Sequence, residues 1–299
     1  MVLPIPLGVG LAFVGAVALA VQSLCIRYGT VRSRSTQALI VVLVVNLLIL
    51  VPVTLLTTDL TAAYTRRSVV AFVGAGLVGT MAGRAFYYEG IKRIGASRAE
   101  PIKASQPLHA SLLALIVLNE TLTGRHFVSL LGIVVGVALI TWETSHGDDT
   151  GGTGSRAALV FPLMGALLYG IEPVIASIGF QDGTGALAGL LIKTLSATIG
   201  FVGYLLWRGA VPARGAYNRH ELQWLAGAGV ANTVFLVAYY RALEVTTVAV
   251  VVPIVQSSPL MVILLSALFV RDTLERVTWR LGLYTVIVVA GAIGVTIYG

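Results

Sequence analysis

Charged side chains are scarce in this sequence, because Asp, Glu, Lys and Arg make up 11% of the 299 residues while hydrophobic residues make up 57%. An ordinary soluble domain carries about 25% charged residues. The mean hydropathy of +0.91 indicates segments that are apolar on every side. The composition therefore excludes a soluble globular protein and predicts an integral membrane protein built from α-helices.

Motifs for cofactors and metals are also missing. The single cysteine, Cys25, excludes an intrachain disulfide and a cysteine-based metal site. No Walker loop, Rossmann glycine set or H-E-x-x-H occurs, so we expect no cofactor, no metal and no ATP hydrolysis. The net charge of +7 comes without any nucleic-acid-binding signature. We therefore assign the basic residues to loops facing the cytoplasm and expect no nucleic-acid partner.

Long apolar stretches separated by polar breaks predict ten membrane spans, each about 20 residues long. The expected spans are residues 7–26, 37–56, 69–88, 101–118, 127–142, 158–178, 185–207, 222–240, 247–270 and 279–298. The longest polar interruption, residues 143–156, has the Gly, Thr and Asp content of a flexible linker. We therefore divide the chain into a first repeat at 1–146, a linker at 147–156 and a second repeat at 157–299.

The two halves repeat each other at one offset of 152 residues. That offset places Tyr87-Tyr88 on Tyr239-Tyr240, and it places the P-I-x-x-S-x-P motif of residues 101–107 on the same motif at 253–259. Several matches at one unbroken offset indicate a duplicated unit of five spans. Because five is odd, the second copy must enter the membrane inverted, which is a common plan of secondary transporters.

Loop charges test this inversion independently. Six Lys or Arg residues lie in the connections after spans 1 and 3, against three after spans 2 and 4. In the second half one lies after spans 6 and 8, against six after spans 7 and 9. The positive-inside rule then places all odd-numbered connections in the cytoplasm and both termini outside.

These features resemble the EamA-type members of the drug/metabolite transporter superfamily. The resemblance rests on two five-span repeats, on the proline-containing fourth span of each, and on the turns Asn119-Glu120-Thr121-Leu122 and Arg271-Asp272-Thr273-Leu274. It implies a multi-pass protein of the plasma membrane, with ten helices around a central cavity. It also implies export or exchange of small metabolites, often amino acids or related compounds.

Placing an ionisable side chain inside an apolar span costs free energy, so each such residue needs a partner of opposite charge or a water-filled cavity. Glu172 lies late in span 6 and precedes Pro173, whose ring weakens the helix there. Lys193 lies near the middle of span 7, and Glu172 is its nearest candidate partner. Glu172 is thus a candidate for proton coupling and Lys193 for substrate binding, with a purely structural ion pair as the alternative.

The fourth span of each repeat supplies the other candidates. Glu100 and Lys103 are three residues apart and share one helix face; Glu100 is a second candidate for proton coupling. Prolines interrupt the hydrogen-bond ladders of both spans, as in transporters that expose backbone groups to a substrate. The expected substrate-binding residues on or beside these spans are Lys103, Ser105, Gln106, Gln256, Ser257, Tyr88 and Tyr240.

Arg84 in span 3 has two interpretations. It could hold a carboxylate of the solute, or it could pair with Glu89 or Glu100, which is the interpretation we favour. Asn46 and Asn232 are expected to hydrogen-bond between helices. Gly132 and Gly136 in span 5 form a G-x-x-x-G motif, which serves either packing within the bundle or a homodimer.

The sequence therefore predicts a secondary active transporter that exports or exchanges a small metabolite by alternating access, with the proton as the candidate coupling ion. Two alternatives stay open. One is a membrane-embedded enzyme acting on a lipid-linked substrate, although the scattered polar residues disfavour it. The other is an uncoupled channel or flippase, which fits the inverted repeat equally well.

Overall fold

The computed structural model describes residues 5–58, 64–106, 108–109, 123–146, 156–211, 218–245, 251, 254–255, 257–269 and 277–298. Regular structure in these residues is helical throughout. The first half contains α1 (Ile5–Gly29), α2 (Ser35–Thr57), α3 (Arg66–Ala75), η1 (Gly76–Gly83), α4 (Arg84–Ile94), α5 (Ala96–Lys103) and α7 (Gly124–His146). The second half contains η2 (Arg156–Leu159), α8 (Val160–Gln181), α9 (Ala186–Trp207), α10 (Arg219–Val245), α12 (Ser258–Phe269) and α13 (Trp279–Tyr298).

Most of the predicted spans are continuous helices. Within the described part of the chain, six helical segments are long and apolar enough to cross a bilayer, and α7, α12 and α13 contribute shorter apolar stretches. Span 3 is longer than predicted, because α3, η1 and α4 form one run from Arg66 to Ile94. Span 4 begins with α5, and the structure describes only part of its remainder. The part of the chain that the structure describes is therefore that of an all-helical membrane protein.

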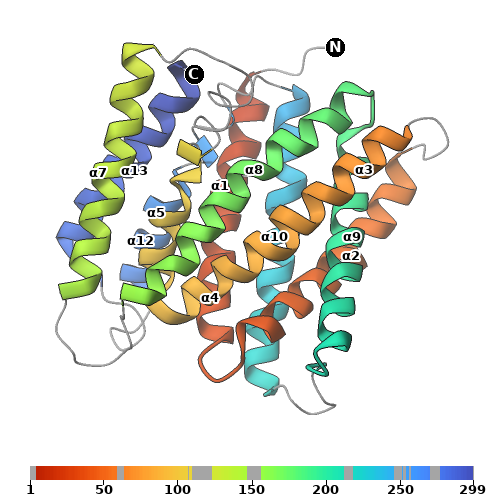
Figure 1. Cartoon of the computed structure of the whole chain (residues 1–299), viewed down its shortest axis with the longest axis horizontal. Coiled ribbons are helices and arrows are strands. Elements are labelled where there is room, and N and C mark those ends of the chain that lie inside the picture. The colour runs from red at the N-terminus through yellow and green to blue at the C-terminus, as the bar shows by residue number, and fades with distance from the viewer. Residues whose placement is uncertain are drawn as a thin grey trace.

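Contacts between the halves occur in symmetric pairs, as an inverted duplication requires. α1 packs on α10, and the equivalent α8 packs on α3. α2 contacts α9 and α7 contacts α13, so each of these helices meets its own counterpart, and α5 of span 4 contacts α12 of the equivalent span 9. In Figure 1, α1 begins at the top of the view whereas α8 begins at the bottom. The two halves therefore run in opposite directions through the bundle.

The breaks in spans 4 and 9 are also equivalent. Ser105 donates from its backbone N–H and from its hydroxyl to the carbonyl of Ile102, at 3.1 and 2.7 Å. Ser257 does the same to the carbonyl of Ile254, at 3.1 and 2.6 Å. Because these positions are 152 residues apart, the sequence repeat corresponds to a repeated local structure in which a tight serine turn interrupts the helix.

The middle of span 3 is a π-helix, η1, which contains Gly76, Gly79 and Gly83. These glycines allow neighbouring helices to approach closely, since a Cβ atom at Gly76 would lie 2.3 Å from the carbonyl oxygen of Lys193. π-Helical turns are rare in proteins, and those that occur are often found at functional sites. These glycines therefore mark an irregular segment within span 3.

The G-x-x-x-G motif of span 5 packs within the bundle. A Cβ atom at Gly132 would lie 3.7 Å from the Cα of Gly291 on α13, and one at Gly136 would lie 3.0 Å from the backbone nitrogen of Val288. Figure 1 shows α7 and α13 side by side at the left edge. The motif thus joins the last helices of the two repeats.

We expect Gly291→Ala to destabilise the protein by about 1–3 kcal/mol, the usual cost of overpacking. Its Cβ would lie 2.7 Å from the backbone oxygen of Ser129 and 2.8 Å from the nitrogen of Ile133, which cannot rotate away. Thermal unfolding followed by a thiol-reactive dye on buried Cys25 measures the effect. Gly282→Ala in the same helix meets no atom within 4 Å and is the matched control. Equal unfolding temperatures for the two variants would contradict the packing described here.

Candidate functional site

The first polar centre in the bundle surrounds Glu100, whose side chain is fully buried. Its Oε1 accepts from Lys103 Nζ at 2.5 Å and from the Ser258 hydroxyl at 3.1 Å. Its Oε2 accepts from the Ser23 hydroxyl at 3.0 Å and from the Tyr87 hydroxyl. Spans 1, 3, 4 and 9 thus converge on one carboxylate, which is held by a cation and three hydroxyl groups.

The second centre is a row of buried amides, named here the amide chain: Gln22 on α1, Asn232 on α10 and Asn46 on α2. Gln22 lies 3.0 Å from the hydroxyl of Tyr88 and 2.8 Å from Asn232, which in turn lies 2.8 Å from Asn46. The hydroxyl of Thr233 lies 3.0 Å from Asn46. The predicted interhelical hydrogen bond between Asn46 and Asn232 is confirmed.

Arg84 joins the amide chain at its Asn46 end. With the Asn46 amide turned so that its nitrogen donates to the carbonyls of Val42 and Gly229, at 3.2 and 3.0 Å, its oxygen accepts from Arg84 Nη1 at 3.1 Å. If the amides of Asn232 and Gln22 turn with it, every contact along the chain remains a donor–acceptor pair. This orientation satisfies more groups and places an acceptor on the buried cation.

The favoured sequence interpretation of Arg84 is therefore wrong. Glu89 pairs with Arg93 at 2.6 Å, and Glu100 pairs with Lys103. Arg84 and Glu89 are five residues apart, so their side chains leave the helix about 140° apart. Of the carboxylates that the structure describes, none lies within 4 Å of Arg84.

The third centre is the ion pair between Lys193 Nζ on α9 and Glu172 Oε1 on α8. Their side chains are 7% and 14% exposed, so the pair is largely shielded from solvent. The sequence predicted this partnership. η1 covers the pair, because a Cβ atom at Gly79 would lie 2.6 Å from Glu172 Cγ. Only glycine at this position allows the carboxylate to lie against the π-helix.

The amide chain and the ion pair occupy equivalent places in the two halves. The amide chain joins the helices of spans 1, 2 and 8, and the ion pair lies among those of spans 6, 7 and 3. Asn232 lies at the repeat offset from Thr80, which is in η1. The helices of spans 1, 2 and 8 therefore enclose neutral amides, whereas the equivalent helices of spans 6, 7 and 3 enclose two opposite charges.

Tyr169 on α8 connects the three centres. It is half-buried and lies within electrostatic range of Arg84, Lys103 and Glu172. Its ring also meets that of Tyr87 edge-on, with 6.2 Å between centroids. The three centres are therefore neighbours within one polar interior. No group of three or more His, Cys, Asp or Glu side chains that could hold a metal gathers among the described residues.

The remaining predicted site residues lie apart from these centres or outside the description. Ser105 and Ser257 donate their hydroxyl protons to nearby backbone carbonyls, and Gln106 is half-buried just after the first of these turns. Gln256 and the side chain of Tyr240 lie outside the described residues. Sequence reasoning missed Gln22 and Ser23. Their adjacency is the signal that could have revealed them, because they interrupt an otherwise apolar stretch of span 1.

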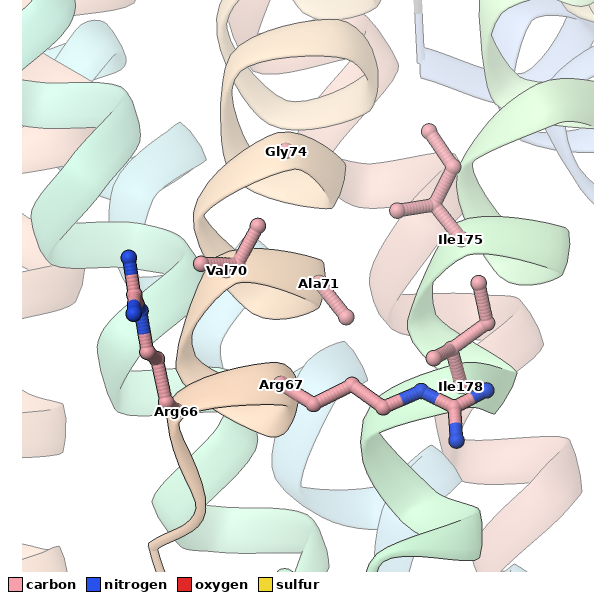
Figure 2. A pocket seen from close by; sticks show the side chains of 7 residues that line it. All are labelled: Arg66, Arg67, Val70, Ala71, Gly74, Ile175 and Ile178. Atoms are coloured by element: carbon pink, nitrogen blue, oxygen red, sulfur yellow. The ribbon is translucent and has the colours of Figure 1, made fainter.

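A separate hollow of about 680 Å³ lies on the flank of the contact between α3 and α8. Its lining is Val70, Ala71, Gly74, Ile175, Ile178, Arg66 and Arg67. Figure 2 shows Arg67 reaching across toward Ile178, while Arg66 points to the other side of α3. The hollow is open and mostly apolar, and the three polar centres contribute no residue to its lining.

Comparisons with known proteins decide the family. Residues 6–142 and 156–297 each match the EamA-like transporter family. This chain belongs to that family. The EamA match makes the protein a multi-pass membrane transporter of small molecules and excludes the enzyme alternative. A solved structure described only as "Crystal structure of protein" superposes on this EamA transporter with a TM-score of 0.61 and 14% identity, covering 95% of this chain and 96% of the other. That likeness shows the fold alone. Among curated proteins nothing matches the sequence.

We expect Lys193→Met to destabilise this EamA transporter strongly, because it leaves the Glu172 carboxylate buried without its cation, which typically costs about 3–5 kcal/mol. The double variant Glu172→Gln/Lys193→Met removes both charges and is expected to recover much of the loss. Unfolding temperatures from the Cys25 dye assay give the coupling between the two residues. Strictly additive effects would mean that the pair contributes no mutual stabilisation.

Proposed function

We propose that this EamA transporter exports a small polar metabolite from the cell by alternating access, driven by inward movement of protons. The observation that carries the proposal is the Glu172–Lys193 pair lying against a glycine-containing π-helix. A titratable pair at an irregular helix allows a change of charge to alter helix packing. Transport of this kind needs such a coupling between ion binding and conformation.

Glu172 is the proposed coupling carboxylate. When Glu172 takes up a proton, its attraction to Lys193 is lost, and two helices of the second half lose the contact that joins them over η1. The ionised Glu172 can instead hold a cationic group of the solute in place of Lys193, so the proton and the solute compete for one carboxylate. This competition gives antiport, in which binding of the proton and of the solute alternate.

Glu100 is the second proposed titratable group. It joins spans 1, 3, 4 and 9 through Ser23, Tyr87, Lys103 and Ser258. Because these spans belong to both halves, protonation at Glu100 would loosen the contact between the halves. The turn residues Ser105, Gln106, Ser257 and Gln256, with Tyr88, Tyr240, Lys103 and Lys193, remain our proposed lining of the substrate path.

The orientation in the membrane is also a proposal. The connections between α1 and α2, α4 and α5, and α9 and α10 lie at the bottom of Figure 1. Basic residues concentrate at that edge: Arg32 and Arg34 lie in the first connection, Lys92 and Arg93 precede the second, and Arg208 lies in the third. By the positive-inside rule the bottom edge faces the cytoplasm of a cell whose plasma membrane holds the protein, with both termini outside.

We expect Glu172→Gln to abolish accumulation driven by a pH gradient while retaining counterflow, because exchange of solute for solute needs no net proton movement. The measurement uses proteoliposomes and radiolabelled L-amino acids. Glu89→Gln, which changes a partly exposed carboxylate beside Arg93, is the matched control. An unchanged pH dependence in Glu172→Gln would overturn coupling at this residue, and the same test on Glu100→Gln separates the two carboxylates. Flux that does not saturate in the wild type would instead indicate a channel.

Two single cysteines introduced into a Cys25→Ala background test the orientation. Val31, between α1 and α2, is 54% exposed, and Tyr64, just before α3, is 40% exposed. A membrane-impermeant maleimide added to intact cells is expected to label Tyr64→Cys and to label Val31→Cys only after the cells are opened. The reverse pattern would invert the proposed orientation, and labelling of both in intact cells would contradict a single orientation.

A further inference from the structure

The charges in and beside the three polar centres do not cancel, and buried Glu221 lies outside these centres, where it accepts from the Arg32 N–H and the Ser33 hydroxyl. Glu100 pairs with Lys103, and Glu172 pairs with Lys193. Arg84 is 5% exposed and has no carboxylate within 4 Å among the residues that the structure describes. Arginine stays protonated in proteins. The polar interior therefore carries one positive charge that the described side chains leave uncompensated.

The surroundings of Arg84 orient this charge without neutralising it. Its Nη1 donates to the oxygen of Asn46 at 3.1 Å. Hydrogen bonds with Asn232 and Thr233 hold Asn46 in position. Tyr88 and Tyr169 lie within electrostatic range. Of the five N–H donors of the guanidinium, the others meet no described acceptor within hydrogen-bond distance. A planar guanidinium that is held in position and has N–H groups without a described acceptor is suited to binding a carboxylate through two parallel hydrogen bonds.

We propose that Arg84 is the subsite for a carboxylate group of the transported solute. This inference rests on the proposed function and adds the chemical class of the cargo. A solute carboxylate would neutralise the charge left over in the interior. A carboxylic acid would therefore bind better than an uncharged analogue of the same shape, and Arg84 would determine that selectivity.

Position supports this assignment. Arg84 follows η1 directly and lies in range of Tyr169, which is also in range of Lys103 and Glu172. Gly79 of η1, five residues before Arg84, lies against the Glu172 carboxylate, so a solute held at Arg84 would lie on the same span as the contact with the ion pair. Arg84 itself contacts the amide chain across α2 and α10, so its occupant would bridge both halves.

Stability without ligand gives the first test. Removal of an uncompensated buried cation is expected to leave the unfolding temperature of Arg84→Gln equal to or above that of the wild type, whereas Lys193→Met, which breaks a pair, is expected to lower it. A fall in Arg84→Gln as large as that in Lys193→Met would show a structural arginine and overturn the proposal.

Ligand binding gives the second test. The probes are the L-amino acids, their carboxamides, mono- and dicarboxylic acids, and sugar phosphates, each added to the purified wild type and to Arg84→Gln and Arg84→Lys. We expect one or more carboxylates, and not their carboxamides, to raise the wild-type unfolding temperature by mass action. In Arg84→Gln the half-saturating concentration is expected to rise by about 30-fold or more, as for loss of a charged hydrogen bond. The half-saturating concentration of Arg84→Lys is expected to lie between those of the wild type and of Arg84→Gln, because lysine keeps the charge and loses the planar fork.

The remaining outcomes separate this inference from the proposed function. Equal shifts by acids and carboxamides, or an unchanged acid shift in Arg84→Gln, would overturn the carboxylate subsite and leave a solute-binding transporter standing. A shift by sugar phosphates alone would also overturn it, in favour of a phosphate site. If no carboxylate raises the unfolding temperature of the wild type, the assignment of Arg84 as a carboxylate subsite fails. Counterflow of uncharged or cationic solutes then still tests transport.

Discussion

Neutralisation of charge in a medium that holds little water is the constraint on which this structure depends. An ionised side chain inside a bundle costs several kcal/mol unless an opposite charge and hydrogen bonds surround it. Glu100 meets this demand with Lys103 and three hydroxyl groups. Since those groups come from spans 1, 3, 4 and 9, the cost of burying one carboxylate fixes how four helices are placed. The apolar surfaces allow many arrangements of these helices in lipid, but the polar centre permits few.

The duplicated halves meet the same constraint with different chemistry. The amide chain of Gln22, Asn232 and Asn46 cannot titrate, so its hydrogen bonds persist at any physiological pH. The equivalent place in the other half holds Glu172 and Lys193, whose attraction depends on proton uptake. Under the proton coupling proposed above, one permanent and one titratable connection would make the relative energies of two conformations depend on pH. Sequence divergence between the two halves would in this way make the transport cycle of a pseudo-symmetric bundle directional.

Much of this organisation was predictable from the sequence, and the failures have physical causes. The repeat offset, the proline breaks and the partnership of Glu172 with Lys193 follow from rules that hold at long range, because a lone charge in a span must find the other lone charge. Arg84 was assigned wrongly since closeness in sequence was taken for closeness in space, although five residues turn a helix by about 140°. Ser23 escaped notice because a hydroxyl in a span costs little free energy and leaves a faint signal in the sequence. Which residues converge on Glu100 depends on helix rotation, which apolar spans do not encode locally.

Glycine in η1 links the charges to the shape of span 3. The Glu172 carboxylate lies where a side chain at Gly79 would otherwise stand, so the π-helix and the ion pair exclude water from each other. A π-helix retains its extra residue only while its neighbours favour it, since the hydrogen-bond pattern of an α-helix is available at every turn. Under the proposed coupling, loss of the Glu172 charge would weaken the packing against η1 and allow span 3 to shift its register toward an α-helix. Arg84 directly follows η1, so the same shift would rotate the uncompensated cation and change what it contacts. The fold therefore brings the ion pair of α8 and α9 against the π-helix of span 3, which directly precedes an arginine that no described carboxylate pairs with.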